Sequence, residues 1–167
     1  TFREISIMEK ITLRICKKED CDKWIDLNKQ FMEYELANTD FWNNTSTRNN
    51  EVFQRTFEDA LNSPELITLF MIEGDGMVIG FANCMTIFSV WAHGKALILD
   101  DLFLIESARG KGYGKRVMNL IEEFAKGQGY KRIQFQSEES NPQAHLFYKS
   151  LGYDFEHMNF YVRYFDD

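Results

Sequence analysis

A glycine-rich loop at residues 109–116 constrains the fold of this chain more than any other feature. The loop reads Arg-Gly-Lys-Gly-Tyr-Gly-Lys-Arg and lies between an apolar run that ends at Ile105 and an amphipathic helical pattern. Glycines at alternate positions allow a tight turn, and a helix start adds unpaired N–H groups and the positive end of its dipole. The sequence therefore predicts a strand–loop–helix unit that cradles a phosphate or pyrophosphate.

The spacing of the glycines excludes two common phosphate-binding loops. A GxGxxG pattern read from Gly110 requires glycine where the chain has Lys115, and read from Gly112 it requires glycine at Val117. The P-loop pattern fails because neither Gly-Lys pair is followed by Ser or Thr. The pattern that fits is Arg-x-x-Gly-x-Gly. The plainer alternative is a strand-to-helix turn with a solvated basic face.

Composition indicates one folded domain without a membrane span. The chain has 167 residues, of which 44% are hydrophobic, and it carries a net charge of −7. We expect residues 8–167 to form a single domain and residues 1–7 to be an N-terminal extension or a cloning remnant. The three cysteines and three histidines are scattered, so we expect no metal site, and we expect a reducing cytoplasmic location. The acidic balance disfavours nucleic acid as a partner.

A run of acidic residues marks the first quarter of the chain. Residues 19–42 contain seven acidic side chains and two lysines. A solvated helix face is the commoner meaning of such a run. The alternative is a surface that attracts a cationic substrate.

Hydrophobic periodicity predicts an alternation of strands and helices. A Gly-Asp-Gly turn at 74–76 predicts a hairpin, and Asn141 followed by Pro142 predicts a helix start. The expected elements are a strand at 12–16, a helix at 19–36, a loop at 37–47, a helix at 52–61, strands at 66–72, 77–88 and 96–105, a helix carrying 117–125, a strand at 132–137, a helix that follows Asn141 to 151, and a closing hairpin at 155–157 and 160–165. The strands on either side of the third helix should be parallel.

This loop and this order of elements resemble the GNAT superfamily of N-acetyltransferases. The resemblance rests on Arg109, Gly112 and Gly114, which match the acetyl-coenzyme A pyrophosphate loop, and it covers nearly the whole chain from Met8 onward. It implies an α/β GNAT fold, with a mixed central sheet of six or seven strands flanked by four helices. Local motifs are similar to the spermidine/spermine N-acetyltransferase branch: the turn Trp91-Ala-His-Gly-Lys, the strand Asp100-Asp-Leu-Phe-Leu and the helical run Phe147-Tyr-Lys.

The resemblance implies acetyl-coenzyme A as co-substrate and no metal. The residues expected to bind it are Leu102, Phe103, Leu104, Arg109, Gly110, Lys111, Gly112, Tyr113, Gly114, Lys115 and Asn141. In the family the pantetheine arm lies along the strand that carries 102–104 like an added strand, so a backbone N–H of that strand is expected to stabilise the developing oxyanion.

The resemblance also implies catalytic roles for Asp100 and Tyr148. An alkyl amine is almost wholly protonated at pH 7, so a base must take its proton, and Asp100 matches the family's glutamate. Strand alternation sends Asp100 and Asp101 to opposite faces, although a bulge would reverse the facing. Tyr148 stands where the family places the acid that protonates the leaving thiolate. The structural alternatives are two carboxylates satisfied at a sheet irregularity and a tyrosine in the core.

The expected function is transfer of an acetyl group to a primary amine, such as a small cationic amine or polyamine. In the family fold the first two helices flank the acceptor side, so the resemblance makes Glu33 and Glu35 candidate acceptor contacts, together with Asp101 and Trp91. The alternatives are acetylation of a protein N-terminus, a lysine or an aminosugar, and a non-catalytic acyl-coenzyme A sensor. Relatives in the polyamine branch are often dimers, so the resemblance makes a homodimer an option.

Overall fold

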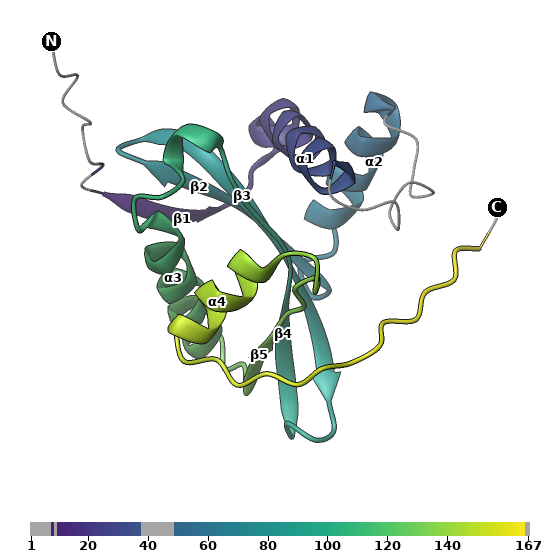
Figure 1. The fold of residues 1–167 in the computed structure, drawn as a ribbon. Helices are drawn as coiled ribbons and strands as arrows, with labels where there is room; N and C mark the ends of the chain where they lie inside the picture. The colour runs from purple at the N-terminus through teal and green to yellow at the C-terminus, as the bar shows by residue number, and fades with distance from the viewer. Residues whose placement is uncertain (1–7, 9, 38–48, 166–167) are drawn as a thin grey trace, which may run out of the picture. The chain divides into compact units, whose positions relative to one another are not determined.

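The computed structural model describes residues 8, 10–37 and 49–165 (Figure 1). The chain divides into two compact units. The first unit, Thr1–Gln136, contains β1 Ile11–Ile15, η1 Lys18–Asp20, α1 Cys21–Leu36, α2 Asn50–Leu61, β2 Ile67–Gly74, β3 Met77–Ser89, β4 Gly94–Leu104, η2 Glu106–Ala108, α3 Tyr113–Gly127 and β5 Arg132–Gln134. The second unit, Ser137–Asp167, contains α4 Pro142–Ser150. The expectation of a single domain stays a prediction.

The sheet runs in the order β1-β2-β3-β4-β5. Its first four strands pair antiparallel, and β4 pairs with β5 in parallel, as the strand–helix–strand pattern predicts. The β2–β3 connection is the expected tight hairpin, since Asp75 and Gly76 both have positive φ, 50° and 82°.

Alternating side chains of β2 form two apolar cores, one on each face of the sheet. Leu69 and Met71 belong to the core that α1 and α2 cover, where the rings of Trp24 and Phe57 have centroids 5.3 Å apart. On the opposite face Phe70 packs edge-on against Phe124 of α3, at a centroid distance of 5.0 Å. Figure 1 shows α1 and α2 on one side of the sheet and α3 on the other. This layering explains why β2 reads as a continuous apolar run.

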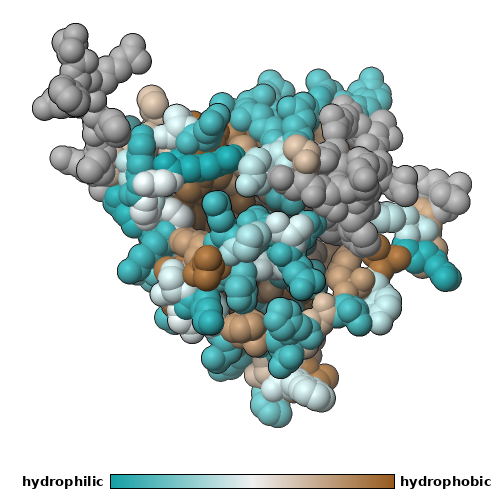
Figure 2. Space-filling view, viewed as in Figure 1, coloured by the Kyte–Doolittle hydropathy of each residue, from teal (hydrophilic) through white to brown (hydrophobic). Residues whose placement is uncertain are grey.

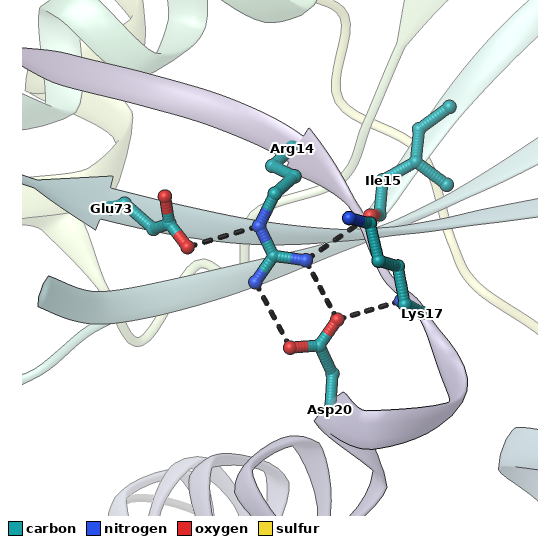
Figure 3. A network of polar contacts seen from close by, with 5 residues as sticks. All are labelled: Arg14, Ile15, Lys17, Asp20 and Glu73. Carbon is teal, nitrogen blue, oxygen red and sulfur yellow. Dashed lines mark hydrogen bonds and ion pairs between the residues drawn. The ribbon is translucent and has the colours of Figure 1, made fainter. Parts of the chain in front are cut away.

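An ion-pair network fixes where α1 begins (Figure 3). Arg14 of β1 donates from both terminal nitrogens to Asp20, at 2.8 and 2.9 Å, and from Nε to Glu73 of β2 at 3.0 Å. The backbone N–H of Lys17 also donates to Asp20. The Arg14 guanidinium holds the pKa of Asp20 below its ordinary value. The network ties the sheet to the start of the helix that carries several of the site residues described below.

Three expectations about the fold need correction or fall outside the described residues. The described residues form five strands, not six or seven, because residues 155–165 contain no strand. A strand is defined by backbone pairing, which apolar alternation alone does not supply. β5 ends at Gln134, three residues earlier than expected, and most of the predicted loop at 37–47 lies outside the described residues.

Two surface properties concern the described part of the chain. None of its helices is long and apolar enough to span a membrane. Hydrophilic side chains cover most of the face seen in Figure 2, and hydrophobic residues show there as separated patches. The most exposed large apolar side chain is Trp91, which is 91% exposed.

Candidate active site

A β-bulge at Asp100 is the central feature of the candidate site. Along the β3–β4 ladder, Asn83 pairs with Asp101, and the next residue, Cys84, pairs with Leu99. Asp100 is therefore an extra residue in β4, and the regular in–out alternation changes at this point. This is the exception that the sequence left open, so alternation alone does not assign the two carboxylates to faces, and which of them faces the acceptor stays a prediction.

The bulge places Asp101 at the end of a chain of buried polar groups. Asn83 Nδ2 donates to Asp101 Oδ2 at 2.8 Å and to Asn28 Oδ1 at 3.3 Å. Trp24 Nε1 donates to Asn83 Oδ1 at 3.0 Å, and Asn28 Nδ2 donates to the Trp24 carbonyl at 2.7 Å. Both asparagines and the tryptophan are buried. Asp101 is thus held by a network that joins β3 and β4 to α1.

The surroundings of Asp101 bring its ionisation close to neutral pH. Burial raises the pKa of Asp101 to about 6, against the lowering effect of the hydrogen bond from Asn83. The negative charges of Asp100 and Glu35 raise this pKa further. A half-buried carboxyl with a perturbed pKa and a fixed orientation is a frequent property of catalytic acids and bases.

Asp100 has a different setting from its neighbour. Its side chain is exposed, and the loss of part of its hydration raises the pKa of its carboxyl. The bulge and the hydrogen bond to Asp101 also agree with the structural alternative, in which the two carboxylates have no catalytic role and are hydrogen-bonded at a sheet irregularity. Activity measurements decide between the two roles, and the assignment of Asp100 as the base stays a prediction.

Among the described residues of the first unit, no strand pairs with the outer edge of β4 next to the bulge. β5 pairs with β4 only at Ala96, Leu97 and Ile98. Further along, the Ile105 N–H donates to Ile79 O on the β3 side. Antiparallel alternation then turns the N–H of Phe103 toward β3 and those of residues 102 and 104 toward the open edge. Two of the three predicted backbone donors therefore face outward.

The glycine loop has the conformation that a phosphate cradle requires. Gly110 and Gly112 have φ of 71° and 79°, in the left-handed region, and α3 begins directly afterwards at Tyr113. Apart from the adjacent residues of the chain, no described atom lies within 4 Å of the position that a Cβ would occupy on either glycine. Lys111 and Lys115 are exposed on the same loop. The open face, the helix start and the two cations fit a pyrophosphate, so the predicted loop residues suit coenzyme A.

The side chains of Tyr113 and Arg109 have other contacts in this structure. Tyr113 is 1% exposed, and its hydroxyl accepts a hydrogen bond from the Met8 N–H at 2.7 Å. Arg109 Nε donates to Leu104 O at 2.8 Å, and its guanidinium lies 4.9 Å from the Tyr34 ring centroid. A contact from Tyr113 to a phosphate would therefore come from its backbone. Arg109 joins the loop to the open edge of β4.

The second unit carries two predicted site residues. Asn141 caps α4 as expected, because its Oδ1 accepts a hydrogen bond from the Ala144 N–H at 3.1 Å. Tyr148 is half-buried on this helix, and its ring lies 5.1 Å from that of Phe147 and 6.4 Å from that of Tyr153. Burial raises the pKa of the Tyr148 hydroxyl, which keeps it protonated and able to donate a proton at neutral pH.

Of the other predicted acceptor contacts, Glu35 lies near Asp101 and Trp91 lies far from it. Glu35 of α1 lies close enough to act on the charge of Asp101. Glu33 is exposed on the same helix. Trp91 lies beyond Ser89 and Gly94, the last residues that pair in the β3–β4 ladder. Ser89 is itself six residues along β3 from Asn83. That separation is roughly 20 Å of strand, so the structure does not bring Trp91 to Asp101.

Sequence reasoning did not identify Asn83, Asn28 and Trp24 as members of the site. The helical spacing of Trp24 and Asn28 indicated only a helix face. The signal that could have revealed the network was an asparagine in each of two otherwise apolar buried patterns, since buried amides are nearly always hydrogen-bonded.

Comparison with known proteins decides the family. The model of the acetyltransferase (GNAT) family matches residues 22–153, most of the chain. The chain belongs to this family. It is an N-acetyltransferase homologue of the acetyl-coenzyme A-dependent type, as the loop motif predicts.

Named relatives show the range of this similarity. The uncharacterized N-acetyltransferase YhfO of Bacillus subtilis is 33% identical over 86 residues, which is 52% of this chain and 58% of YhfO. The chain thus spans little more than half of that relative. A thialysine N-epsilon-acetyltransferase of Sus scrofa is 25% identical over 87% of this chain and 85% of its own. Aminoglycoside N-acetyltransferase AAC(6')-Iy, solved with coenzyme A, superposes with a TM-score of 0.70 at 18% identity, covering 92% of this GNAT chain and 95% of that protein.

The open space above Gly112 leads to a direct prediction for this GNAT protein. A Gly112→Val variant places a β-branched residue at φ of 79° and a side chain over the loop. We expect it to weaken acetyl-coenzyme A binding at least about tenfold, because both the turn and the phosphate site are disturbed. Calorimetric titration measures this. Gly76→Val, in the β2–β3 turn at a similar φ of 82°, is the matched control. A folded Gly112→Val protein with wild-type affinity would contradict the role of the loop.

Proposed function

We propose that this enzyme transfers the acetyl group of acetyl-coenzyme A to the primary amine of a small cationic acceptor. The observation that carries the proposal is the half-buried Asp101 carboxyl, held by Asn83 and flanked by the negative charges of Asp100 and Glu35. Three carboxylates around one point favour a cation over a neutral or acidic acceptor. The similarity to thialysine N-epsilon-acetyltransferases over most of the chain supports an amine acceptor.

The co-substrate would be held by the glycine loop and the open edge of β4. Backbone N–H groups of residues 110–115 and the side chains of Lys111 and Lys115 would bind the pyrophosphate, which matches the left-handed glycines and the helix start. When bound, acetyl-coenzyme A supplies the acetyl group as a reactive thioester. The outward N–H groups of Leu102 and Leu104 can donate to a carbonyl oxygen at this edge, where such donors are worth about 2.7–4 kcal/mol in other acyl transfers.

Asp101 would take the proton that the amine must lose before it can attack. A free alkyl ammonium has a pKa near 10.4, whereas an ordinary aspartate has a pKa near 3.9. The raised pKa of about 6 narrows this gap, while the carboxyl still remains mostly ionised at pH 7 and able to bind a cation. We therefore prefer Asp101 to Asp100 as the base. Asp100 and Glu35 would then bind the distal positive charge.

Tyr148 would supply the proton that the leaving thiolate requires. A thiol has a pKa near 8.5 and a tyrosine near 10, so the transfer is only modestly uphill. The raised pKa of Tyr148 keeps the donor form populated across the neutral range. This role follows from the resemblance of the α4 motif and awaits the kinetic test given in the Discussion.

An acceptor panel tests the proposal. The purified protein is incubated with acetyl-coenzyme A and diamines, polyamines, lysine analogues, aminosugars and N-terminal peptides, and the released thiol is measured. We expect release with cationic diamines or lysine-like amines and a lower rate with peptides and aminosugars. Tight acetyl-coenzyme A binding without release for any amine would instead support the non-catalytic sensor.

A further inference from the structure

The amide groups of the hydrogen-bonded network that holds Asp101, formed by Trp24, Asn28 and Asn83, can have only one orientation. An indole N–H is a donor only, so Trp24 requires the oxygen of the Asn83 amide to face it. A backbone carbonyl is an acceptor only, so the bond from Asn28 to the Trp24 carbonyl turns the Asn28 oxygen toward Asn83. Both constraints direct the NH₂ group of Asn83 toward its two remaining partners. The amide cannot flip without losing bonds in a buried site.

The fixed amide divides the two oxygens of Asp101 between different tasks. Asn83 donates to Oδ2 at 2.8 Å, so Oδ2 must remain an acceptor there. A proton on Oδ2 would place two hydrogens against each other in this contact. A proton taken up by this carboxyl is therefore directed to Oδ1. The ladder supports the same geometry, because Asn83 and Asp101 are direct cross-strand neighbours beside the bulge.

We infer that Asn83 is a positioning residue for acetyl transfer, which holds Oδ2 of Asp101 and leaves Oδ1 as the oxygen that receives the proton of the amine. The inference rests on the proposed function, in which Asp101 is the base. Trp24 and Asn28 act on Asp101 only through Asn83, because their hydrogen bonds set the orientation of the Asn83 amide. Residues of α1 thereby have separate roles, because Trp24 and Asn28 orient the Asn83 amide and Glu35 lies close enough to act on the Asp101 charge.

The groups around Asp101 determine how a change at Asn83 should appear. The hydrogen bond from Asn83 lowers the pKa of Asp101, while Asp100 on the same strand and Glu35 on α1 raise it. Cys84, the neighbour of Asn83 on β3, carries no charge at neutral pH, because burial raises the pKa of its thiol to about 12. Removing the Asn83 donor should thus raise the pKa of Asp101, and removing the Glu35 charge should lower it.

The test is a pair of titrations on the full chain. Carboxyl-carbon NMR follows the Asp101 ionisation, assigned by its absence in Asp101→Asn, and the pH profile of kcat/KM follows the acid limb of activity. We expect Asn83→Leu to move both upward by about one to two pH units, the value of one lost hydrogen bond to a charged group. Glu35→Gln should move both downward. Asn62→Leu, at the exposed end of α2, is the matched asparagine control and should move neither.

Two further variants keep the inference testable if Asn83→Leu fails to fold. Asn83→Ser retains a hydroxyl donor, so we expect it to raise the pKa of Asp101 by less than Asn83→Leu does. Trp24→Phe removes the group that orients the Asn83 amide, and it should also raise this pKa by less than Asn83→Leu does. A folded variant without a donor at position 83, with both titrations at the wild-type position, would overturn the inference. If the carboxyl titration moves and the acid limb does not, Asp101 is not the base. That result would overturn both the proposed role of Asp101 and the inference. Unchanged titrations in a folded variant without a donor at position 83 would overturn the inference alone and leave the proposed function standing.

Discussion

Replacing Asp101 with asparagine is expected to lower turnover by about 10²–10⁴-fold near pH 7, because general base catalysis is typically worth that much. The loss should shrink at high pH, where more of the amine is already neutral. The wild-type enzyme should lose activity as the pH falls through about 6, because protonated Asp101 can neither bind the ammonium nor accept its proton. Asp101→Asn should lack this acid limb. Steady-state kinetics with saturating acetyl-coenzyme A measure both effects.

Asp100→Asn is the matched comparison for this prediction. Asp100 is exposed on the bulge, and we expect its loss to raise the KM of the acceptor more than it lowers kcat, because it would contribute attraction without taking the proton. The opposite outcome, a large loss of kcat in Asp100→Asn with near-normal turnover in Asp101→Asn, would return the base to Asp100. That is the assignment implied by the family motif.

Replacing Tyr148 with phenylalanine should lower kcat by about 10²–10⁴-fold while the affinity for acetyl-coenzyme A stays within about twofold of wild type. The reason is that the proton is needed only in the transition state, whereas the ring and its packing against Phe147 are retained. Single-turnover measurements under conditions where chemistry limits the rate provide the test. Tyr153→Phe removes a hydroxyl from a neighbouring ring in the same unit and serves as the control. Equal turnover of Tyr148→Phe and wild type would remove Tyr148 from the mechanism.

The glycine loop, the parallel β4–β5 pair and the start of α4 could be predicted because short local patterns determine them. A helix start after Gly112 follows from the amphipathic run, and the cap at Asn141 follows from its side chain and the proline after it. These features depend on residues that are close in sequence. The same holds for the hairpin turn at Asp75 and Gly76, where two adjacent residues adopt positive φ.

The arrangement of the carboxylates could not be predicted in the same way. A bulge depends on how two strands pair, and no residue type in Asp100-Asp101 requires one. The partners of Asp101 lie 18 residues away on β3 and, through Asn83, on α1, so their meeting is a tertiary event. The hydrogen bond from Arg109 Nε to Leu104 O was likewise not predictable from the sequence, and the predicted phosphate contact of Arg109 stays a prediction.

The absence of strands in residues 155–165 has the same kind of cause. Their alternating apolar residues satisfy the composition of a strand, but strand formation requires a partner with matching register. The exposed side chains of Phe155 and Met158 show that apolar character alone did not bury this segment.

The measurement that tests the central claim most directly compares three acceptors with the same three-methylene chain: 1,3-diaminopropane, butylamine and 4-aminobutyrate. Each offers the same primary amine, and only the distal group changes, from ammonium to methyl to carboxylate. Carboxylates at Asp101, Asp100 and Glu35 predict that kcat/KM is highest for the diamine and lowest for the amino acid, with steps of at least about tenfold, or about 1.4 kcal/mol each. The differences should narrow as salt rises, since exposed charges are screened over about 8 Å at physiological ionic strength. Equal kcat/KM for the three compounds, or reaction with the carboxylate alone, would contradict a site built for a cationic amine.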